Sequence, residues 1–166
     1  MGQIIDRRVS AEIEGEFVVF MIGMRINRPW KFWSWLPVAQ AMPRMLIELA
    51  KQPDLGLLHV RTHFGFPNIM GIQYWRSFDH LEAYARNRDA AHLPAWQAFN
   101  KQVGSNGDVG IWHETYAIAP GRYESVYNNM PRFGLGAAGE IVDAVGYRNE
   151  ARKRMKGAIA GAEAAG

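Results

Sequence analysis

Four segments of the chain carry short apolar runs or an alternation of apolar and polar residues, and this pattern predicts β-strands. The first, residues 16–26, is rich in β-branched and aromatic residues. The others are residues 55–63, 69–76 and 109–118, each bounded by glycine, proline or asparagine. Residues 64–68 have turn chemistry, so we expect the second and third strands to pair as a hairpin.

Two further segments place apolar residues three and four positions apart, which is typical of amphipathic helices. In residues 32–51 these positions are Trp35, Val38, Ala39, Met42, Met45, Leu46 and Leu49. Pro43 removes a backbone hydrogen bond there, so we expect this helix to start late or bend. Ser77 is a good N-cap for the second helix, which we expect to break near residues 87–92 and to resume at Pro94.

The order strand, helix, strand, strand, helix, strand predicts an α+β fold of the ferredoxin-like βαββαβ type. Two helices then cover one face of an antiparallel sheet. We expect the bare face to pack against a second copy, which makes a homodimer of the dimeric α+β barrel kind. The predicted division is an N-terminal arm (1–15), the barrel domain (16–131) and a C-terminal tail (132–166) with a helix over 141–160.

Composition narrows the function classes. The 166 residues suffice for one domain, and 48% of them are apolar, which indicates a folded protein. The absence of cysteine excludes disulfides, thiolate metal sites and cysteine nucleophiles. A net charge of +3 without a long basic stripe argues against nucleic-acid binding. No apolar run is long enough for a membrane span and no leader is visible, so we expect a cytoplasmic protein.

The strand at 109–118 carries the first candidate for chemistry. Side chains alternate along a strand, so His113 shares a face with Ile111 and Thr115, whereas Trp112 and Glu114 lie on the other face. If the helices cover the His113 face, the imidazole projects into an apolar cavity and can act as a general base. A histidine bonded to a neighbouring backbone or carboxylate group is an equal alternative.

The second candidate is His92, at the expected break in the second helix. Trp96 lies one turn further on, and a break that faces a sheet creates concavity. The alternative is that His92 caps the carbonyl groups of the first helical segment. On the strand at 55–63, Leu57, His59, Arg61 and His63 are expected to share one face, which is either solvent-exposed or the polar wall of a pocket or dimer seam.

Four short segments of the sequence resemble a known family. They are YWRSFDHLEAYA at 74–85, HLPAW at 92–96, GIWHETY at 110–116 and YESVYNNMP at 123–131. This combination is similar to a bacterial and fungal monooxygenase-like family, with a fungal member in fumagillin-type biosynthesis, within the dimeric α+β barrel superfamily. The superfamily agrees with the fold expected from the strand and helix pattern.

The resemblance implies three alternative functions. The first is a small-molecule monooxygenase for an apolar, terpenoid- or polyketide-like substrate, with His113 and His92 as catalytic candidates and no cofactor. The aromatic pocket would be built by Trp96, Trp112, Tyr74, Trp75 and Trp30, with Arg76 and Glu114 as nearby charges. The second is a haem-binding protein or a haem-dependent enzyme, aldoxime-dehydratase-like or haem-degrading-like, with His92 as the axial ligand. The third is a non-catalytic ligand-binding dimer.

Overall fold

The protein was analysed as a computed structural model, which describes residues 2–87, 104 and 106–155. The elements of these residues follow in chain order. They are β1 (Ile5–Glu12), β2 (Phe17–Ile26), α1 (Phe32–Lys51), η1 (Pro53–Leu55), β3 (Leu57–Phe64), β4 (Asn68–Trp75), α2 (Phe78–Arg86), β5 (Val109–Ile118), β6 (Tyr127–Met130), α4 (Leu135–Ala138), β7 (Glu140–Asp143) and η2 (Gly146–Asn149).

The larger sheet has four antiparallel strands in the order β3-β4-β2-β5. These are the four strands that the apolar pattern predicts, and β3 and β4 form the expected hairpin. The central strand β2 pairs with β4 on one side and with β5 on the other, so β3 and β5 are the edges. With α1 and α2 between the strands in sequence, the predicted ferredoxin-like α+β fold is confirmed.

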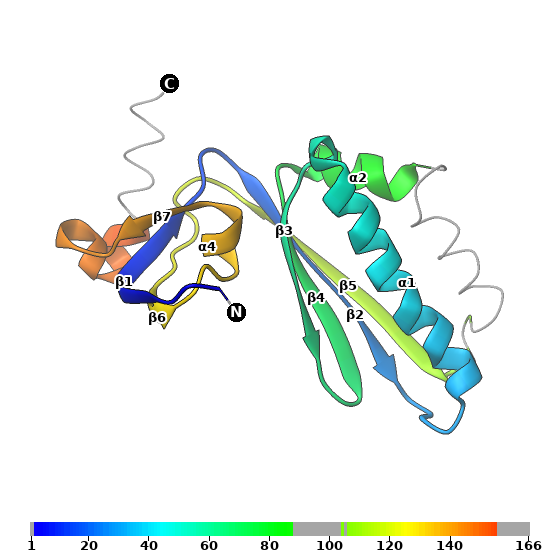
Figure 1. The fold of residues 1–166 in the computed structure, drawn as a ribbon. Helices are drawn as coiled ribbons and strands as arrows, with labels where there is room; N and C mark the ends of the chain where they lie inside the picture. The colour runs from blue at the N-terminus through cyan, green and yellow to red at the C-terminus, as the bar shows by residue number, and fades with distance from the viewer. Residues whose placement is uncertain (1, 88–103, 105, 156–166) are drawn as a thin grey trace.

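Both helices lie on one side of this sheet (Figure 1). α1 is continuous from Phe32 to Lys51 and holds both Pro37 and Pro43, so it does not start late as Pro43 suggested. α2 begins as predicted, because the Ser77 hydroxyl accepts a hydrogen bond from the His80 backbone N–H. The predicted break near residues 87–92 and the restart at Pro94 lie largely outside the described residues.

The helix-covered face is packed as two separate apolar clusters. One joins Val18 and Trp75 of the sheet to Leu49 of α1 and to Leu81 and Tyr84 of α2. The other, toward the start of α1, consists of Met24, Ile26 and Val109 with Trp35, Val38, Ala39 and Ile69 packed against them. α1 therefore contacts the sheet near both of its ends.

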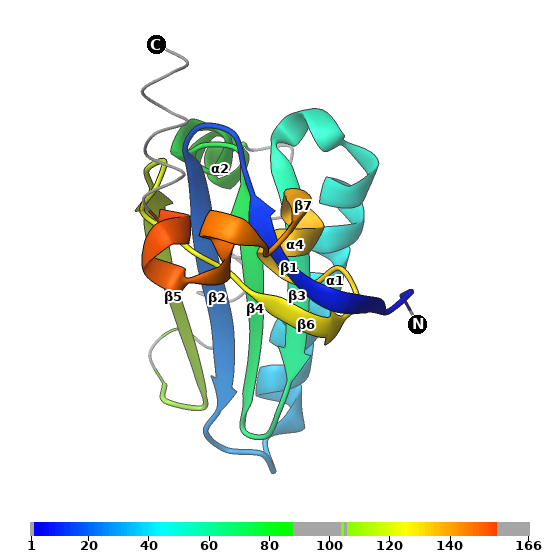
Figure 2. The same ribbon diagram turned by 90° about the vertical axis from the view of Figure 1, so that its left-hand side faces the viewer.

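The other face of the sheet is partly covered by a second, three-stranded sheet in the order β6-β1-β7 together with α4 (Figure 2). Phe17 of β2 packs there against Ala11 of β1 and Leu135 of α4. Half-buried apolar side chains surround this contact: Ile13, Val19, Tyr74, Ile118, Tyr123, Tyr127 and Ile141. The face that the sequence analysis expects to be bare is thus covered at one end within the chain.

The second sheet corrects the expectation for the tail. Instead of a helix over 141–160, residues 140–143 form β7, which pairs with β1, and residues 151–155 are helical. Ile141 is drawn into the strand because its side chain packs in the cluster between the two sheets. The division at 15/16 and 131/132 stays a prediction, although strands from both flanking segments meet in one sheet.

Candidate functional site

The strand register brings polar and small side chains together across the middle of the helix-covered face. One row reads Val60, Gln73, Phe20 and Thr115 from β3 to β5, and the next reads Thr62, Gly71, Ile22 and His113. These eight residues are named the middle band here. Phe20 of the first row packs against the first apolar cluster, and the second row lies between the two clusters.

Gly71 leaves room at the centre of the band. A Cβ atom added there would lie 3.9 Å from Ile22 Cγ2 and would meet no other described side chain within 4 Å. α1 crosses this level between Ala39 and Leu46, the innermost of its residues that pack against the two clusters. Gly71 is itself buried, and Met42 and Met45, which lie between Ala39 and Leu46 on α1, are half-buried.

His113 ends the second row on the edge strand β5. Its ring lies 5.6 Å from the ring of Phe20, the next aromatic residue of the band. The side chain is exposed in the described chain, so both ring nitrogens can reach solvent or a ligand. The helices thus cover the His113 face, but the ring lies exposed at the edge of the sheet and does not project into an enclosed apolar cavity as expected.

Gln73 is the buried polar residue of the band. Its Oε1 accepts a hydrogen bond of 2.8 Å from Trp75 Nε1, which fixes the amide within the core. The sequence analysis did not single out Gln73, Gly71 or Thr62. Alternation along β3 and β4 offered the signal, because polar and small residues interrupt the apolar positions of one face.

The structure separates His113 from three of its predicted partners. Trp112 and Glu114 project from the opposite face of β5, and Tyr74 projects from the corresponding face of β4, where it joins the cluster between the sheets. The Trp112 indole lies over Gly23, and Glu114 accepts a 2.7 Å hydrogen bond from Tyr116. The two faces of one strand cannot line the same pocket of a single chain.

The remaining predicted residues are dispersed. Trp75 is packed in the first apolar cluster with 1% of its surface exposed, which leaves no area for a ligand. Trp30 precedes α1 at the far end of the sheet, and Arg76 is exposed just after β4. His92 and Trp96 lie outside the described residues, so their predicted roles, including axial haem ligation by His92, stay predictions.

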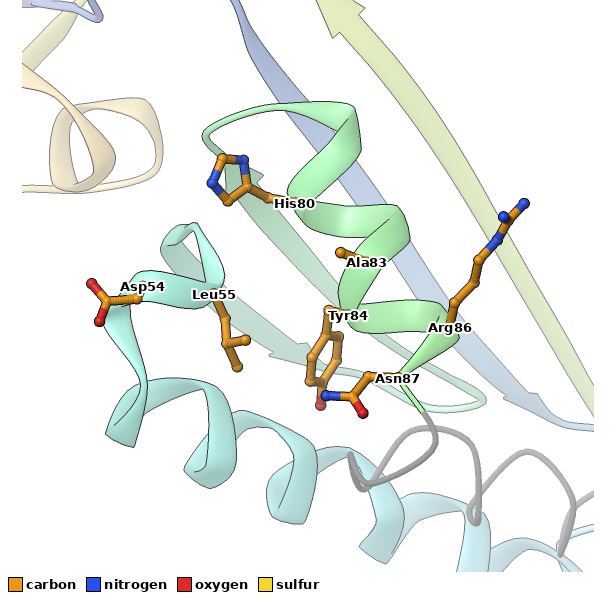
Figure 3. A pocket seen from close by; sticks show the side chains of 7 residues that line it. All are labelled: Asp54, Leu55, His80, Ala83, Tyr84, Arg86 and Asn87. Atoms are coloured by element: carbon orange, nitrogen blue, oxygen red, sulfur yellow. The ribbon is translucent and has the colours of Figure 1, made fainter.

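A concavity of about 400 Å³ lies between η1 and α2 (Figure 3). Two of its polar side chains, Tyr84 and His80, hold the fold through hydrogen bonds. The Tyr84 hydroxyl donates to Glu48 over 3.0 Å, and His80 Nδ1 lies 2.7 Å from Ser77 Oγ. Burial and the neighbouring Glu48 carboxylate raise the pKa of Tyr84, so this hydroxyl stays protonated. We therefore favour the middle band as the candidate site.

On the opposite face, His59 is held between the two sheets. Its Nε2 is buried and has no hydrogen-bond partner among the described residues. Arg61 stacks 4.2 Å above the ring of Phe133, and His63 lies 6.5 Å from the same ring. Burial and the Arg61 charge lower the pKa of His59 from its ordinary 6.5. His59 is thus enclosed within one chain, whereas Arg61 and His63 are solvent-exposed. Leu57 does not share their face as predicted, because the register shifts between Leu57 and His59 and Leu57 packs in the helix-covered cluster.

His59 is expected to make stability depend on pH. Because its pKa is lowered on folding, the unfolded chain binds a proton more readily, so the contribution of His59 to stability is fully present above the ordinary pKa of 6.5 and is lost as the pH falls through the lowered pKa of the folded state. Urea unfolding across this range should give a flatter profile for His59→Gln than for the parent. His63→Gln, on the same face but exposed, should retain the parent profile; an unchanged slope in His59→Gln would contradict this assignment.

Neither a metal-binding cluster nor a membrane-spanning helix is present among the described residues. No group of three or more histidine, aspartate or glutamate side chains lies close enough to hold a metal ion within residues 2–87 and 106–155. Over the same part of the chain, none of the helices has the length and apolar character that a membrane crossing requires.

Comparisons with known proteins identify relatives. A family model described as "Monooxygenase af470-like" matches residues 17–135. Monooxygenase af470 of Aspergillus fumigatus (strain ATCC MYA-4609 / CBS 101355 / FGSC A1100 / Af293) is 26% identical over 186 residues, an alignment that covers 100% of this chain. The chain spans 65% of the length of that relative.

Among solved structures, the aldoxime dehydratase OxdRE in complex with butyraldoxime is similar in fold. The match has a TM-score of 0.64 at 14% identity and covers 83% of this chain but 43% of the dehydratase. SnoaB, a cofactor-independent oxygenase from Streptomyces nogalater, matches with a TM-score of 0.44 at 13% identity, over 61% of this chain and 91% of SnoaB. At these identities the likeness concerns the fold alone.

Proposed function

The chain belongs to the monooxygenase af470-like family, whose model spans most of its length, and on this basis we propose that it oxygenates an apolar small molecule bound along the middle band. The observation that carries the proposal is the row Thr62, Gly71, Ile22 and His113, in which a residue without a side chain and an exposed imidazole flank Ile22 on the helix-covered face. Apolar walls with a few polar groups are the usual composition of small-molecule sites.

The substrate class follows from the lining. Phe20 and Ile22 offer apolar surface, whereas Thr62, Gln73 and Thr115 offer a few hydrogen-bonding groups. This combination suits a terpenoid- or polyketide-like molecule with one or two oxygen functions. Among the eight residues of the band, His113 carries the side chain that can act as a base on such a molecule.

The chemistry proposed for such a substrate needs no added reductant. His113 takes a proton from an activated CH₂ group, and the resulting carbanion transfers its electron pair to dioxygen, forming a C–O bond. The proton returns to the terminal oxygen, which gives a hydroperoxide. Loss of the second C–H proton with cleavage of the O–O bond yields a carbonyl group and water. One oxygen atom enters the product, and the substrate supplies all four electrons.

We also propose that the chain works as a homodimer through the part of the sheet that the second sheet leaves uncovered. Met21, Met70, Ile72 and Trp112 present half-buried apolar surface on that face. Analytical ultracentrifugation should give a dimer mass for the parent. A dimer mass retained by Trp112→Glu would contradict the assignment of this face.

Oxygen uptake with a polyketide-type carbon acid such as anthrone tests the proposed reaction. With ¹⁸O₂, one label should appear in the product and one in water. Gly71→Val adds bulk between Thr62 and Ile22 and is expected to raise KM about tenfold or more, because the added methyl groups would occupy the place proposed for the substrate. Gly110→Val, on the opposite face of β5, is the matched control and should behave like the parent.

Three results would point elsewhere. Label from water rather than from dioxygen in the product would contradict an oxygenase. A Soret band in protein purified from haem-sufficient cells would favour the haem-binding alternative with His92 as ligand. Tight binding of the probe without oxygen uptake would favour the non-catalytic ligand-binding dimer.

A further inference from the structure

Exposed aromatic side chains gather at one end of the molecule. Six Phe and Trp side chains are exposed in the described part of the chain, and five of them come from two segments at this end. They are Trp30 (69%), Phe32 (58%), Trp33 (61%), Phe64 (80%) and Phe66 (75%), named the aromatic tip here. Large exposed apolar patches on soluble proteins mark protein or membrane contacts.

The two segments lie side by side. The hairpin of β3 and β4 carries Phe64 and Phe66, the connection from β2 to α1 carries Trp30, and the first turn of α1 carries Phe32 and Trp33. The hairpin and the connection both reach the lower end of the molecule in Figures 1 and 2. The Ile26 N–H donates to the Pro67 carbonyl over 2.9 Å, which ties the hairpin turn to the end of β2. The tip is therefore one surface built from two segments.

A buried carboxylate fixes the connection that carries Trp30. Asp108 accepts hydrogen bonds from Arg28 (2.8 Å), Lys31 (3.1 Å) and Ser34 (3.1 Å). Burial alone would raise its pKa, but the hydrogen bonds from Lys31, Ser34 and Arg28 hold the pKa of the Asp108 carboxyl below its usual range. These contacts hold residues 28–34 in place, so the rings of Trp30, Phe32 and Trp33 are displayed by a fixed segment.

The charge around the tip has one sign. Residues 25–34 and 64–68 contain Arg25, Arg28 and Lys31 and no acidic residue, and Asp108 next to them offsets one positive charge. Tryptophan beside basic residues is the composition of surfaces that enter the headgroup region of anionic bilayers. A contact between two copies through this surface would instead bring like charges together.

We propose that the aromatic tip docks the protein on an anionic lipid bilayer, with the five rings in the headgroup region and the basic side chains on the phosphates. The docking surface shares no residue with the middle band, so this proposal stands independently of the oxygenase chemistry. An apolar substrate that partitions into bilayers would be concentrated at the same surface.

Vesicle flotation with the full chain tests the docking. We expect the parent to float with vesicles of phosphatidylcholine and phosphatidylglycerol, less with phosphatidylcholine alone, and less in high salt. The double variants Trp30→Ala/Trp33→Ala and Phe64→Ser/Phe66→Ser should each lower the partition coefficient about tenfold or more. Phe78→Ala removes the sixth exposed Phe or Trp ring of the described chain. This ring lies beyond the opposite end of β4, so the variant should float like the parent.

Circular dichroism establishes that each variant is folded before flotation. The proposal is overturned if the parent floats with neither kind of vesicle, or if both double variants float as well as the parent. It is also overturned if the parent is an oligomer that Trp30→Ala/Trp33→Ala converts to a smaller species without change in flotation, since the tip would then be a contact between copies.

Discussion

Replacing Trp75 with alanine is expected to lower the free energy of unfolding by about 4 kcal/mol. Trp75 is the largest of the fully buried side chains and sits on β4 where α1 and α2 both meet the sheet. Its ring lies 5.8 Å from that of Tyr84, and its Nε1 is bonded to Gln73. The variant therefore loses apolar burial, leaves a cavity and orphans a buried amide oxygen.

Chemical denaturation measures this loss, with Trp33→Ala as the matched control. Trp33 has the same side chain but 61% of it is exposed, so its removal should change stability by less than about 0.5 kcal/mol. Trp75→Phe separates the two contributions, because it retains most of the apolar volume and removes the hydrogen bond. Equal stability of Trp75→Ala and Trp33→Ala would show that the cluster between α1, α2 and β4 does not support the fold.

The four strands of the larger sheet were predictable because local pattern suffices to define them. The run at 17–26 is rich in apolar, β-branched and aromatic residues, and it becomes the strand that pairs with both β4 and β5. Ser77 signalled the start of α2 through an interaction within its own turn. In each case the residues that decide the conformation are neighbours in sequence.

The second sheet could not be predicted in the same way. β1 reads as IDRRVSAE, a mixture without a clear period, and only its second half is buried. It is held by partners that lie more than a hundred positions away: Arg148 bonds to Glu12 across 136 residues, and Ser10 bonds to the Ser125 carbonyl across 115. Contacts of this range leave no mark on local hydrophobic periodicity.

The alternation of side chains along the strands predicted only part of the candidate site. It placed His113 and Trp112 on opposite faces of β5, which the register confirms, but it could not say which face the helices cover. Grouping Tyr74 and Trp112 with His113 by their aromatic character joined side chains from two faces. The middle band emerged only when the register aligned Gly71 of β4 with Ile22 and His113.

His113→Ala is expected to lower the turnover number by about 10²- to 10⁴-fold, the contribution usual for a positioned general base. The side chain is exposed at the edge of the sheet and none of the hydrogen bonds described for the chain depends on it, so the variant should keep the parent's stability. Because Phe20 and Ile22 remain to hold the substrate, KM should change much less than the turnover number.

Steady-state oxygen uptake with the substrate used for the parent measures the effect. The matched control is His63→Ala, which removes an exposed imidazole from the opposite face of β3. Exposure of His113 allows a sharper criterion, since free imidazole can reach the same place from solvent. Added imidazole should restore part of the turnover of His113→Ala and none in His113→Phe, where the ring fills the space. If His113→Ala turns over like the parent, proton removal on the middle band belongs to another group and the assignment of His113 as base is wrong.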